Sequence, residues 1–155
     1  MPEQQSEIEP YTPPRLFARA VRARVPVVVA VAGGGALGAL VRYEITAHAG
    51  VATDSFPWPT FWINVSGSFL LGLLLTFVLE RWPPTRYVRP FLAIGVLGAY
   101  TTFSTYVLEI DLLLRDGHVG VALSYAIVSL AAGAVAVYLG VVTGRWWPSL
   151  RGRGR

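Results

Sequence analysis

The sequence predicts an all-α membrane protein in which four transmembrane helices form one domain and the third helix is broken in mid-membrane. The chain of 155 residues is 54% hydrophobic and only 14% charged, a composition outside that of ordinary soluble domains. A bilayer core of about 30 Å requires roughly 20 helical residues. Apolar stretches of that length recur between residues 25 and 145, and polar residues inside one of them predict the break.

Residues 1–24 are expected to form a disordered basic tail. They begin with Pro, Glu, Gln and Ser, which cannot bury a core. A basic stretch before an apolar run also resembles a secretory signal, but this run is longer than a typical signal core and has no convincing cleavage site. We therefore predict a retained first helix over residues 25–47. The basic patch before it consists of Arg15, Arg19, Arg22 and Arg24.

Three further spans are predicted over residues 61–79, 89–114 and 119–143. The second and fourth spans contain no charged residue. Turn-forming sequences at residues 54–59, 82–85 and 115–118 separate the spans, and residues 146–155 form a basic carboxyl-terminal tail. Tryptophans near the span ends are expected to anchor in the headgroup region. They are Trp58, Trp62, Trp82, Trp146 and Trp147.

The arginines predict the orientation in the membrane. Four spans place both termini on one side. All but two of the 13 basic residues, Arg42 and Arg115, lie in or next to the tails or in the loop between the second and third spans. Cytoplasmic segments near spans carry an excess of Arg and Lys. The sequence thus predicts a multi-pass protein of the plasma membrane with cytoplasmic termini, and this clustering beside apolar runs argues against nucleic-acid binding.

Several classes of site are excluded or lack support. The chain has no cysteine, so disulfides, thiolate metal sites and cysteine nucleophiles are excluded. No serine has the base and carboxylate pattern of a hydrolase, and His48 and His118 lack the partners of a metal site. No phosphate-cradling loop stands out. We expect that the protein is not an enzyme.

The third span contains residues that a simple membrane helix would not. Glycines, consecutive threonines and aromatic residues occupy residues 95–106, with the sequence GVLGAYTTFSTY. Irregular backbone at membrane depth is tolerated only where it is buried in protein or lines a wet cavity, so this stretch is interpreted as a site. Phe103 and Tyr106 lie on one helical face with Thr102 nearby. Aromatic ring edges suit an anion, whereas exposed carbonyls suit a small cation.

Polar residues also occur in the second and fourth spans. Asn64 is an amide in an apolar helix, and it serves either as interhelical glue or as a donor that lines a pore for an anion. Tyr125 and Ser129 share one face of the fourth span and offer hydroxyls without charge.

Charged and small residues complete the pattern. Arg42 ends the first span, where snorkelling to the interface is one interpretation. Glu109 and Asp111 lie near the end of the third span and are expected to be hydrated. Small residues four positions apart are expected to let helices approach closely. These pairs are Gly34 with Gly38, Gly95 with Ala99, and Gly140 with Gly144.

Together these residues resemble the small four-helix fluoride channel family called Fluc or CrcB. The similarity covers nearly all four spans, and its motifs occur in the family's order and spacing. The motifs are Gly34-Gly35-x-x-Gly38-Ala39-x-x-Arg42-Tyr43, Thr60-x-x-x-Asn64-x-x-Gly67-x-Phe69-x-x-Gly72, and Gly95-x-x-Gly98-x-x-Thr101-Thr102-Phe103-Ser104-Thr105 followed by Glu109.

The resemblance implies antiparallel dimers with two pores that export fluoride passively and so confer fluoride resistance. It implies a structural sodium ion, held by backbone carbonyls of the broken third helix at Gly98 and Thr101. A selective path must replace water around fluoride with hydrogen-bond donors and weakly positive edges rather than with a full charge. Arg42 and Gly67 are assigned structural roles. The predicted fluoride pore consists of Asn64, Thr102, Phe103, Tyr106, Tyr125 and Ser129.

The chain also departs from the family pattern. Tyr106 replaces a second phenylalanine, Pro59 and Ala99 replace common glycines, and Gly133 stands where a second hydroxyl is often found. With the arginine bias, these departures leave two assemblies open, a homodimer and a heterodimer with an oppositely oriented paralogue. In the heterodimer this subunit conducts partly or not at all. A proton-coupled exporter is a further alternative, but it requires a membrane-embedded carboxylate, which the second and fourth spans lack.

Overall fold

The computed structural model describes residues 15–49, 54–78 and 86–146, with only the backbone for residues 15–21. Within these ranges the structure is helical and contains no strand. Four helices are long and apolar enough to cross a membrane, which confirms the predicted four-span, all-α fold class. They are Arg22–Ala49, Trp58–Thr76, Pro90–Arg115 and Val119–Trp146. The predicted anchors Trp82 and Trp147 lie outside the described residues.

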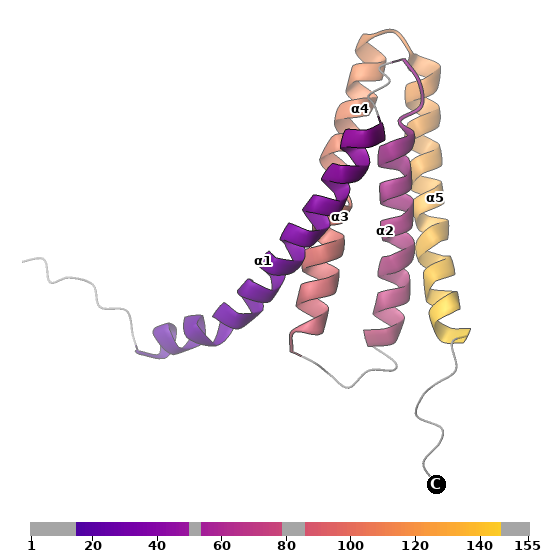
Figure 1. Cartoon of the computed structure of the whole chain (residues 1–155). Helices are drawn as coiled ribbons and strands as arrows, with labels where there is room; N and C mark the ends of the chain where they lie inside the picture. Colours follow the sequence, from indigo (N-terminus) through magenta and orange to yellow (C-terminus); the bar gives the residue numbers. More distant parts are fainter. Residues whose placement is uncertain (1–14, 50–53, 79–85, 147–155) are drawn as a thin grey trace, which may run out of the picture.

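The first span belongs to α1, Arg15–Ala49. Residues 15–24, which were predicted to lie in a disordered tail, are thus helical, because they are rich in Arg and Ala, which are good helix formers. Pro26 lies inside α1, where it removes a backbone donor and favours a bend. In Figure 1 the amino-terminal part of α1 turns away from the other helices. Residues 1–14 lie outside the described ranges, so their disorder stays a prediction.

The second and fourth spans form a packed pair. α2, Trp58–Thr76, runs beside α5, Val119–Trp146, along its length (Figure 1). Glycines permit the close approach, because a Cβ on Gly72 would collide with the Val137 carbonyl and a Cβ on Gly140 would collide with the Phe69 carbonyl. The predicted packing role of Gly140 is confirmed.

The first span packs in the same way against the first half of the third span. This half consists of the π-helical segment η2, Pro90–Leu97, and the short helix α3, Gly98–Tyr100. A Cβ on Gly34 would collide with the Phe91 carbonyl, and one on Gly38 with the Val96 carbonyl. The predicted packing of this glycine pair is therefore confirmed as well.

The third span changes conformation before its second half, α4, Phe103–Arg115. Thr101 has φ −74° and ψ 156°, and Thr102 has φ −145° and ψ 118°, so both residues are extended. Extended residues cannot continue the ladder of helical hydrogen bonds. We call these two residues the break. The N–H and carbonyl of Thr102, which leave the helical ladder there, are the starting point for the site.

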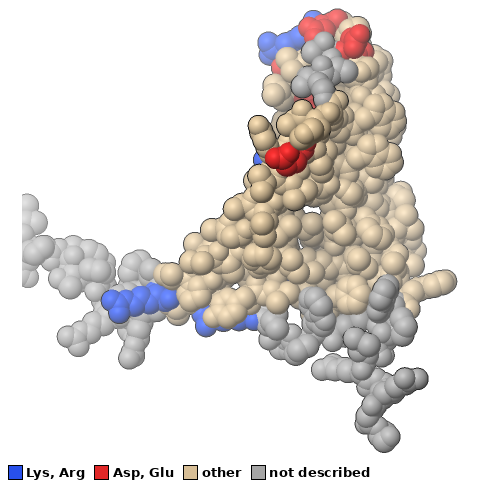
Figure 2. All heavy atoms as spheres, in the orientation of Figure 1, with Lys and Arg blue, Asp and Glu red and all other residues tan. Residues whose placement is uncertain are grey.

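The core and the acidic residues lie toward the end of the bundle that carries the turn between α4 and α5. Gly117, with φ 82°, makes this turn, as residues 115–118 predict. Figure 2 shows most acidic side chains gathered toward this end, with some basic atoms beside them, and the other large basic groups at the opposite end of the molecule. The principal core cluster consists of Phe61, Tyr106, Leu113, Ala122 and Tyr125.

Candidate functional site

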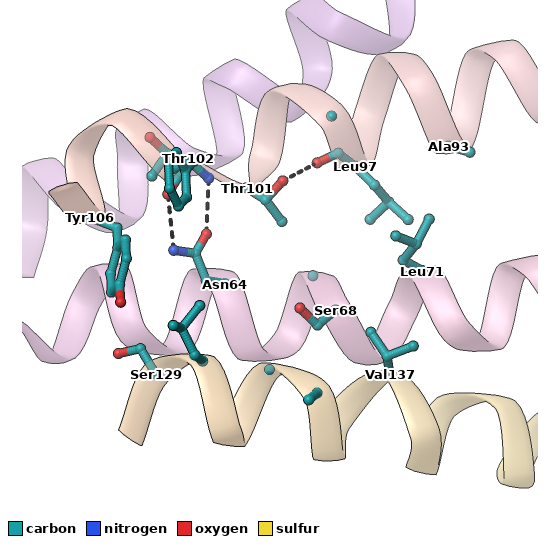
Figure 3. A pocket seen from close by; sticks show the side chains of 16 residues that line it. Asn64, Ser68, Leu71, Ala93, Leu97, Thr101, Thr102, Tyr106, Ser129 and Val137 are labelled. Carbon is teal, nitrogen blue, oxygen red and sulfur yellow. Dashed lines mark hydrogen bonds between the residues drawn. The ribbon is translucent and has the colours of Figure 1, made fainter. Parts of the chain in front are cut away.

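Asn64 of α2 bonds to both backbone groups of an extended residue in the third span. Its Nδ2 donates to the Thr102 carbonyl at 3.0 Å, and its Oδ1 accepts from the Thr102 N–H at 2.9 Å (Figure 3). One side chain thereby satisfies a donor and an acceptor that the break removes from the helix. Asn64 therefore joins α2 to the third span through hydrogen bonds to the backbone. Its second Nδ2 proton is left to donate to another acceptor.

The threonines at the break cap the two helical halves. The Thr101 hydroxyl donates to the Leu97 carbonyl at 2.9 Å. The Thr102 hydroxyl accepts from the Thr105 N–H at 3.2 Å, as the N-cap of α4. The side chain of Thr102, a predicted pore residue, is thus already bonded within its own chain.

The two residues assigned structural roles both contact the break. Arg42 points its Nη1 at the Thr101 carbonyl at 3.4 Å, so it turns toward the bundle as well as lying near the end of α1. Gly67 faces Thr101, because a Cβ on Gly67 would collide with the Thr101 methyl group and come within 3.2 Å of the Tyr100 ring. A larger residue at position 67 would displace the break.

A cavity of about 420 Å³ lies beside the break, between α2, the third span and α5 (Figure 3). Among the described residues, no charged side chain lines this cavity. The polar groups on its walls are the amide of Asn64 and a few hydroxyls, while most of the wall is apolar. All predicted site residues except Arg42 and Tyr125 line it, namely Asn64, Gly67, Gly98, Thr101, Thr102, Phe103, Tyr106 and Ser129.

Ser129 contributes an unusual group to this cavity. Its Oγ is buried and has no hydrogen-bond partner. Among the described residues, every other buried side-chain nitrogen or oxygen atom has a partner. Leaving a buried hydroxyl unpaired typically costs about 1–3 kcal/mol. A group that costs stability in the free protein is suited to bind something that enters the cavity.

The two aromatic residues of the predicted pore differ in environment. Phe103 is 73% exposed in the single chain, whereas Tyr106 is 6% exposed. Their ring centroids are 5.8 Å apart. The Tyr106 hydroxyl donates to the Ala126 carbonyl on α5 at 2.8 Å, and Tyr106 is among the residues that line the cavity.

The carbonyls of Gly98 and Thr101, which the resemblance implies as sodium ligands, lose their helical N–H partners, although the Arg42 Nη1 lies 3.4 Å from the Thr101 carbonyl. In an unbroken α-helix they would accept from the N–H groups of Thr102 and Thr105. These two N–H groups donate instead to Asn64 and to the Thr102 hydroxyl. Since a Cβ on Gly98 would have only the Ala93 carbonyl nearby, at 3.8 Å, the space beside Gly98 is open.

A second polar cluster was not foreseen from the sequence. Glu109 accepts from the Thr60 hydroxyl at Oε1 and from the Tyr125 hydroxyl at Oε2, both at 2.7 Å. Thr60 is 2% exposed and Tyr125 is 0% exposed. Glu109 is partly exposed, as expected near the end of the span, but both of its oxygens also bond to buried hydroxyls. Thr60 and Glu109 line a separate cavity of about 590 Å³.

This cluster separates two residues that the sequence grouped together. Tyr125 and Ser129 share a face of α5, but Tyr125 bonds to Glu109 and does not line the cavity that Ser129 lines. Three different helices supply the cluster, so no spacing along the chain could reveal it. The signal available in the sequence was the acidic residue Glu109 near the end of a membrane-length span.

Comparisons with known proteins agree with this picture. The family model described as CrcB-like protein, Camphor Resistance (CrcB), matches residues 29–141. Fluoride-specific ion channel FluC 3 of Streptomyces avermitilis is 52% identical over 124 residues, which are 80% of this chain and 61% of that protein, less than two thirds of its length. FluC 2 of Nocardia farcinica is 43% identical over 129 residues, 80% of this chain and 92% of that protein. Fluoride-specific ion channel FluC 2 of Streptomyces avermitilis is 40% identical over 133 residues, 84% of each chain.

Proposed function

This chain belongs to the CrcB family, and we propose that it forms a passive, fluoride-selective channel that lowers fluoride in the cytoplasm. Its relatives are named as fluoride-specific ion channels, in line with the expectation that the protein is not an enzyme. The observation that carries the proposal is the cavity beside the break. It is lined by Ser129, whose hydroxyl is unpaired, and by the Asn64 amide, and none of its lining residues in the described part of the chain is charged.

The cavity chemistry suits a small, strongly hydrated anion. Hydroxyl and amide donors can replace part of its water, and aromatic ring edges add weak positive potential. A full positive charge would bind fluoride too tightly for it to leave, whereas several weak sites allow both entry and exit. Phe103 and Tyr106 supply the rings in this proposal, and Asn64 and Ser129 supply the donors.

Fluoride efflux from liposomes containing the purified full chain tests this function. The expected result is fluoride release that continues when the proton gradient is collapsed, with little chloride release. Absence of fluoride release, from the chain alone and together with a paralogue, would contradict the proposal. Substitution of Asn64 or Phe103 that left the flux of the assembly unchanged would remove these residues from the pore.

A proton-coupled exporter remains a second candidate because of Glu109. This carboxylate lies within the third membrane-length helix and is only partly exposed, as an embedded proton carrier would be. Loss of fluoride transport when the proton gradient is collapsed would favour the exporter. Flux that persists in the Glu109→Gln variant without a proton gradient would exclude it.

We also propose an antiparallel dimer, formed either by two copies or with an oppositely oriented paralogue. The exposure of Phe103 supports a partner, because a pore ring that is 73% exposed in one chain needs a second surface to enclose it. The arginine bias supports a single orientation with cytoplasmic termini in the plasma membrane. The two related channels of Streptomyces avermitilis illustrate that such proteins occur as paralogues.

Orientation and assembly can be tested together. Accessibility of single cysteines at the two tails from each side of the cell membrane will report the orientation, since the chain has no native cysteine. One orientation predicts a heterodimer, and a mixture of both predicts a dual-topology homodimer. A conducting dimer reconstituted from this chain alone would contradict the heterodimer.

A structural sodium ion at the break completes the proposal. The carbonyls of Gly98 and Thr101 would hold it, and the ion would offset the partial negative charge of carbonyls released from the helix. Purification without sodium is expected to lower both dimer stability and fluoride flux. Equal stability and flux with potassium in place of sodium would contradict this part of the proposal.

A further inference from the structure

Ser68 of α2 lies one helical turn after Asn64 and lines the same cavity. Four residues of α-helix rise about 6 Å, and residues four positions apart share a face. In Figure 3, Asn64, Ser68 and Leu71 follow one another along the cavity. Since α2 begins beside the α4–α5 turn, Ser68 lies on the side of Asn64 that is farther from this turn.

The Ser68 hydroxyl has no hydrogen-bond partner in the described part of the chain. Hydroxyls on helices commonly bond back to a carbonyl three or four residues earlier, as those of Thr46 and Ser66 do here. The corresponding carbonyls for Ser68 are those of Asn64 and Val65, and Ser68 bonds to neither. Its hydroxyl is therefore available to a partner that enters the cavity.

The Ser68 Oγ is also accessible. Among the described residues, the Ser129 Oγ is the side-chain polar atom that is both buried and unpaired. The unpaired Ser68 Oγ is thus not buried, and Ser68 as a whole is partly exposed. An added Cβ on Gly133 of α5 would lie 3.6 Å from the Ser68 Oγ. Because glycine has no side chain, α5 leaves the space in front of this hydroxyl open.

The other hydroxyls on the cavity wall are less available than that of Ser68. Three of them already donate hydrogen bonds within the chain, namely those of Thr101, Thr102 and Tyr106. The Ser129 hydroxyl is unpaired, but its Oγ is buried. Apolar residues form the wall beyond Ser68, and they include Leu71, Ala93, Leu97 and Val137. Ser68 therefore offers an accessible hydroxyl donor where the polar wall gives way to the apolar one.

We propose that Ser68 is a fluoride-binding residue, whose hydroxyl donates to the ion on the side of the break that is farther from the α4–α5 turn. This inference rests on the proposed function as a fluoride channel. An ion that leaves water loses hydrogen bonds that an apolar wall cannot replace. A hydroxyl one turn beyond Asn64 provides the next donor along the path, and weak sites in succession let the ion move on.

Fluoride efflux and thermal unfolding of the conducting assembly, with full-length chains, test this role. Ser68→Ala is expected to raise the half-saturating fluoride concentration about tenfold, as for the loss of one hydrogen bond to a charged group. The unfolding temperature is expected to stay unchanged, because Ser68 has no partner to lose. The matched control is Ser124→Ala on α5, which removes an exposed hydroxyl that bonds to the Val121 carbonyl and does not line the cavity. It is expected to keep the half-saturating concentration of the parent.

Protection by fluoride separates a residue that touches the ion from one that only shapes the cavity. The chain has no cysteine, so the Ser68→Cys variant carries a single thiol, which silver ion in chloride-free solution can modify. Silver is expected to block the flux of this variant, and fluoride is expected to slow the block, whereas nitrate at the same concentration is not. The control is Leu70→Cys, because Leu70 is 43% exposed in the chain but does not line the cavity. Silver is expected to leave the flux of this control unchanged.

The possible outcomes are distinct. A half-saturating concentration that is the same in Ser68→Ala as in the parent would overturn the role of Ser68 and leave the channel function standing. Absence of silver block in Ser68→Cys, or a block that fluoride does not slow, would do the same. A parent assembly without fluoride flux would overturn the channel function and this inference with it. If Ser68→Ala fails to assemble, Ser68→Gly also removes the hydroxyl and is judged by the same measurements.

Discussion

Two polar clusters lie along the same helices, one around Asn64 at the break and one around Glu109, and they differ in charge. At the break, the neutral amide of Asn64 satisfies the backbone of Thr102, and no charged residue lines the cavity beside it within residues 15–49, 54–78 and 86–146. Nearer the α4–α5 turn, the carboxylate of Glu109 is held by Thr60 and Tyr125. The protein thus keeps its negative charge outside the cavity where we propose that fluoride binds, where it would repel the ion.

The comparison predicts that the break depends most on Asn64. Asn64→Leu would leave the Thr102 N–H and carbonyl without partners, at a cost of about 1–3 kcal/mol each. We expect a fluoride flux at least tenfold lower and a lower unfolding temperature of the assembly, measured by efflux and by thermal unfolding in detergent.

The control for Asn64→Leu is Ser68→Ala on the same helix. Ser68 lines the same cavity but makes no hydrogen bond to the break. The Ser68→Ala variant should have the same unfolding temperature as the parent. If Asn64→Leu were as stable as Ser68→Ala, the amide would not hold the break.

Gly67→Ala is expected to have the next largest effect. The added methyl group would collide with the Thr101 side chain, and overpacking of this kind costs about 1–3 kcal/mol. We expect a lower unfolding temperature and reduced flux. Gly120→Ala is the matched control, because a Cβ there meets nothing within 4 Å. Similar behaviour of the two variants would mean that α2 does not fix the position of Thr101.

Glu109→Gln sharpens the contrast between the clusters. The amide can still bond to Thr60 and Tyr125, but hydrogen bonds to an ionised group are roughly twice as strong as neutral ones. A loss of about 1 kcal/mol in stability is therefore expected, with flux reduced less than in Asn64→Leu. A larger loss of flux than in Asn64→Leu would place the proposed ion path at Glu109 rather than at the neutral cavity.

The smallest effect is expected where charges are hydrated. Arg115 donates to Asp111 at 2.8 Å, but the two side chains are 74% and 49% exposed. Exposed pairs of this kind contribute about 0–1 kcal/mol. Arg115→Gln should leave flux within twofold of the parent and change the unfolding temperature little, and a severe loss in either measurement would show that this end of the bundle has a role beyond solvation.

Much of the fold could be predicted because it depends on local sequence. Span lengths follow from apolar runs, and close helix packing follows from glycine spacing, as at Gly34 and Gly38. The π-helical form of η2 was not predicted, because it reflects a shift in hydrogen-bond register that composition does not encode. The helical start at Arg15 was not predicted, because the Pro-, Glu-, Gln- and Ser-rich composition that indicates disorder is confined to the residues before it.

The amino-acid sequence by itself determined the membrane class, the number of spans and the polar residues of the third span. Only the tertiary structure decided which partners those residues have: Asn64 pairs with Thr102, Tyr125 pairs with Glu109, and Ser129 is left free. The physical reason is that helical periodicity fixes the face on which a side chain lies, whereas the partner on that face comes from another helix. Which helices meet, and at what height, depends on packing between segments far apart in the chain.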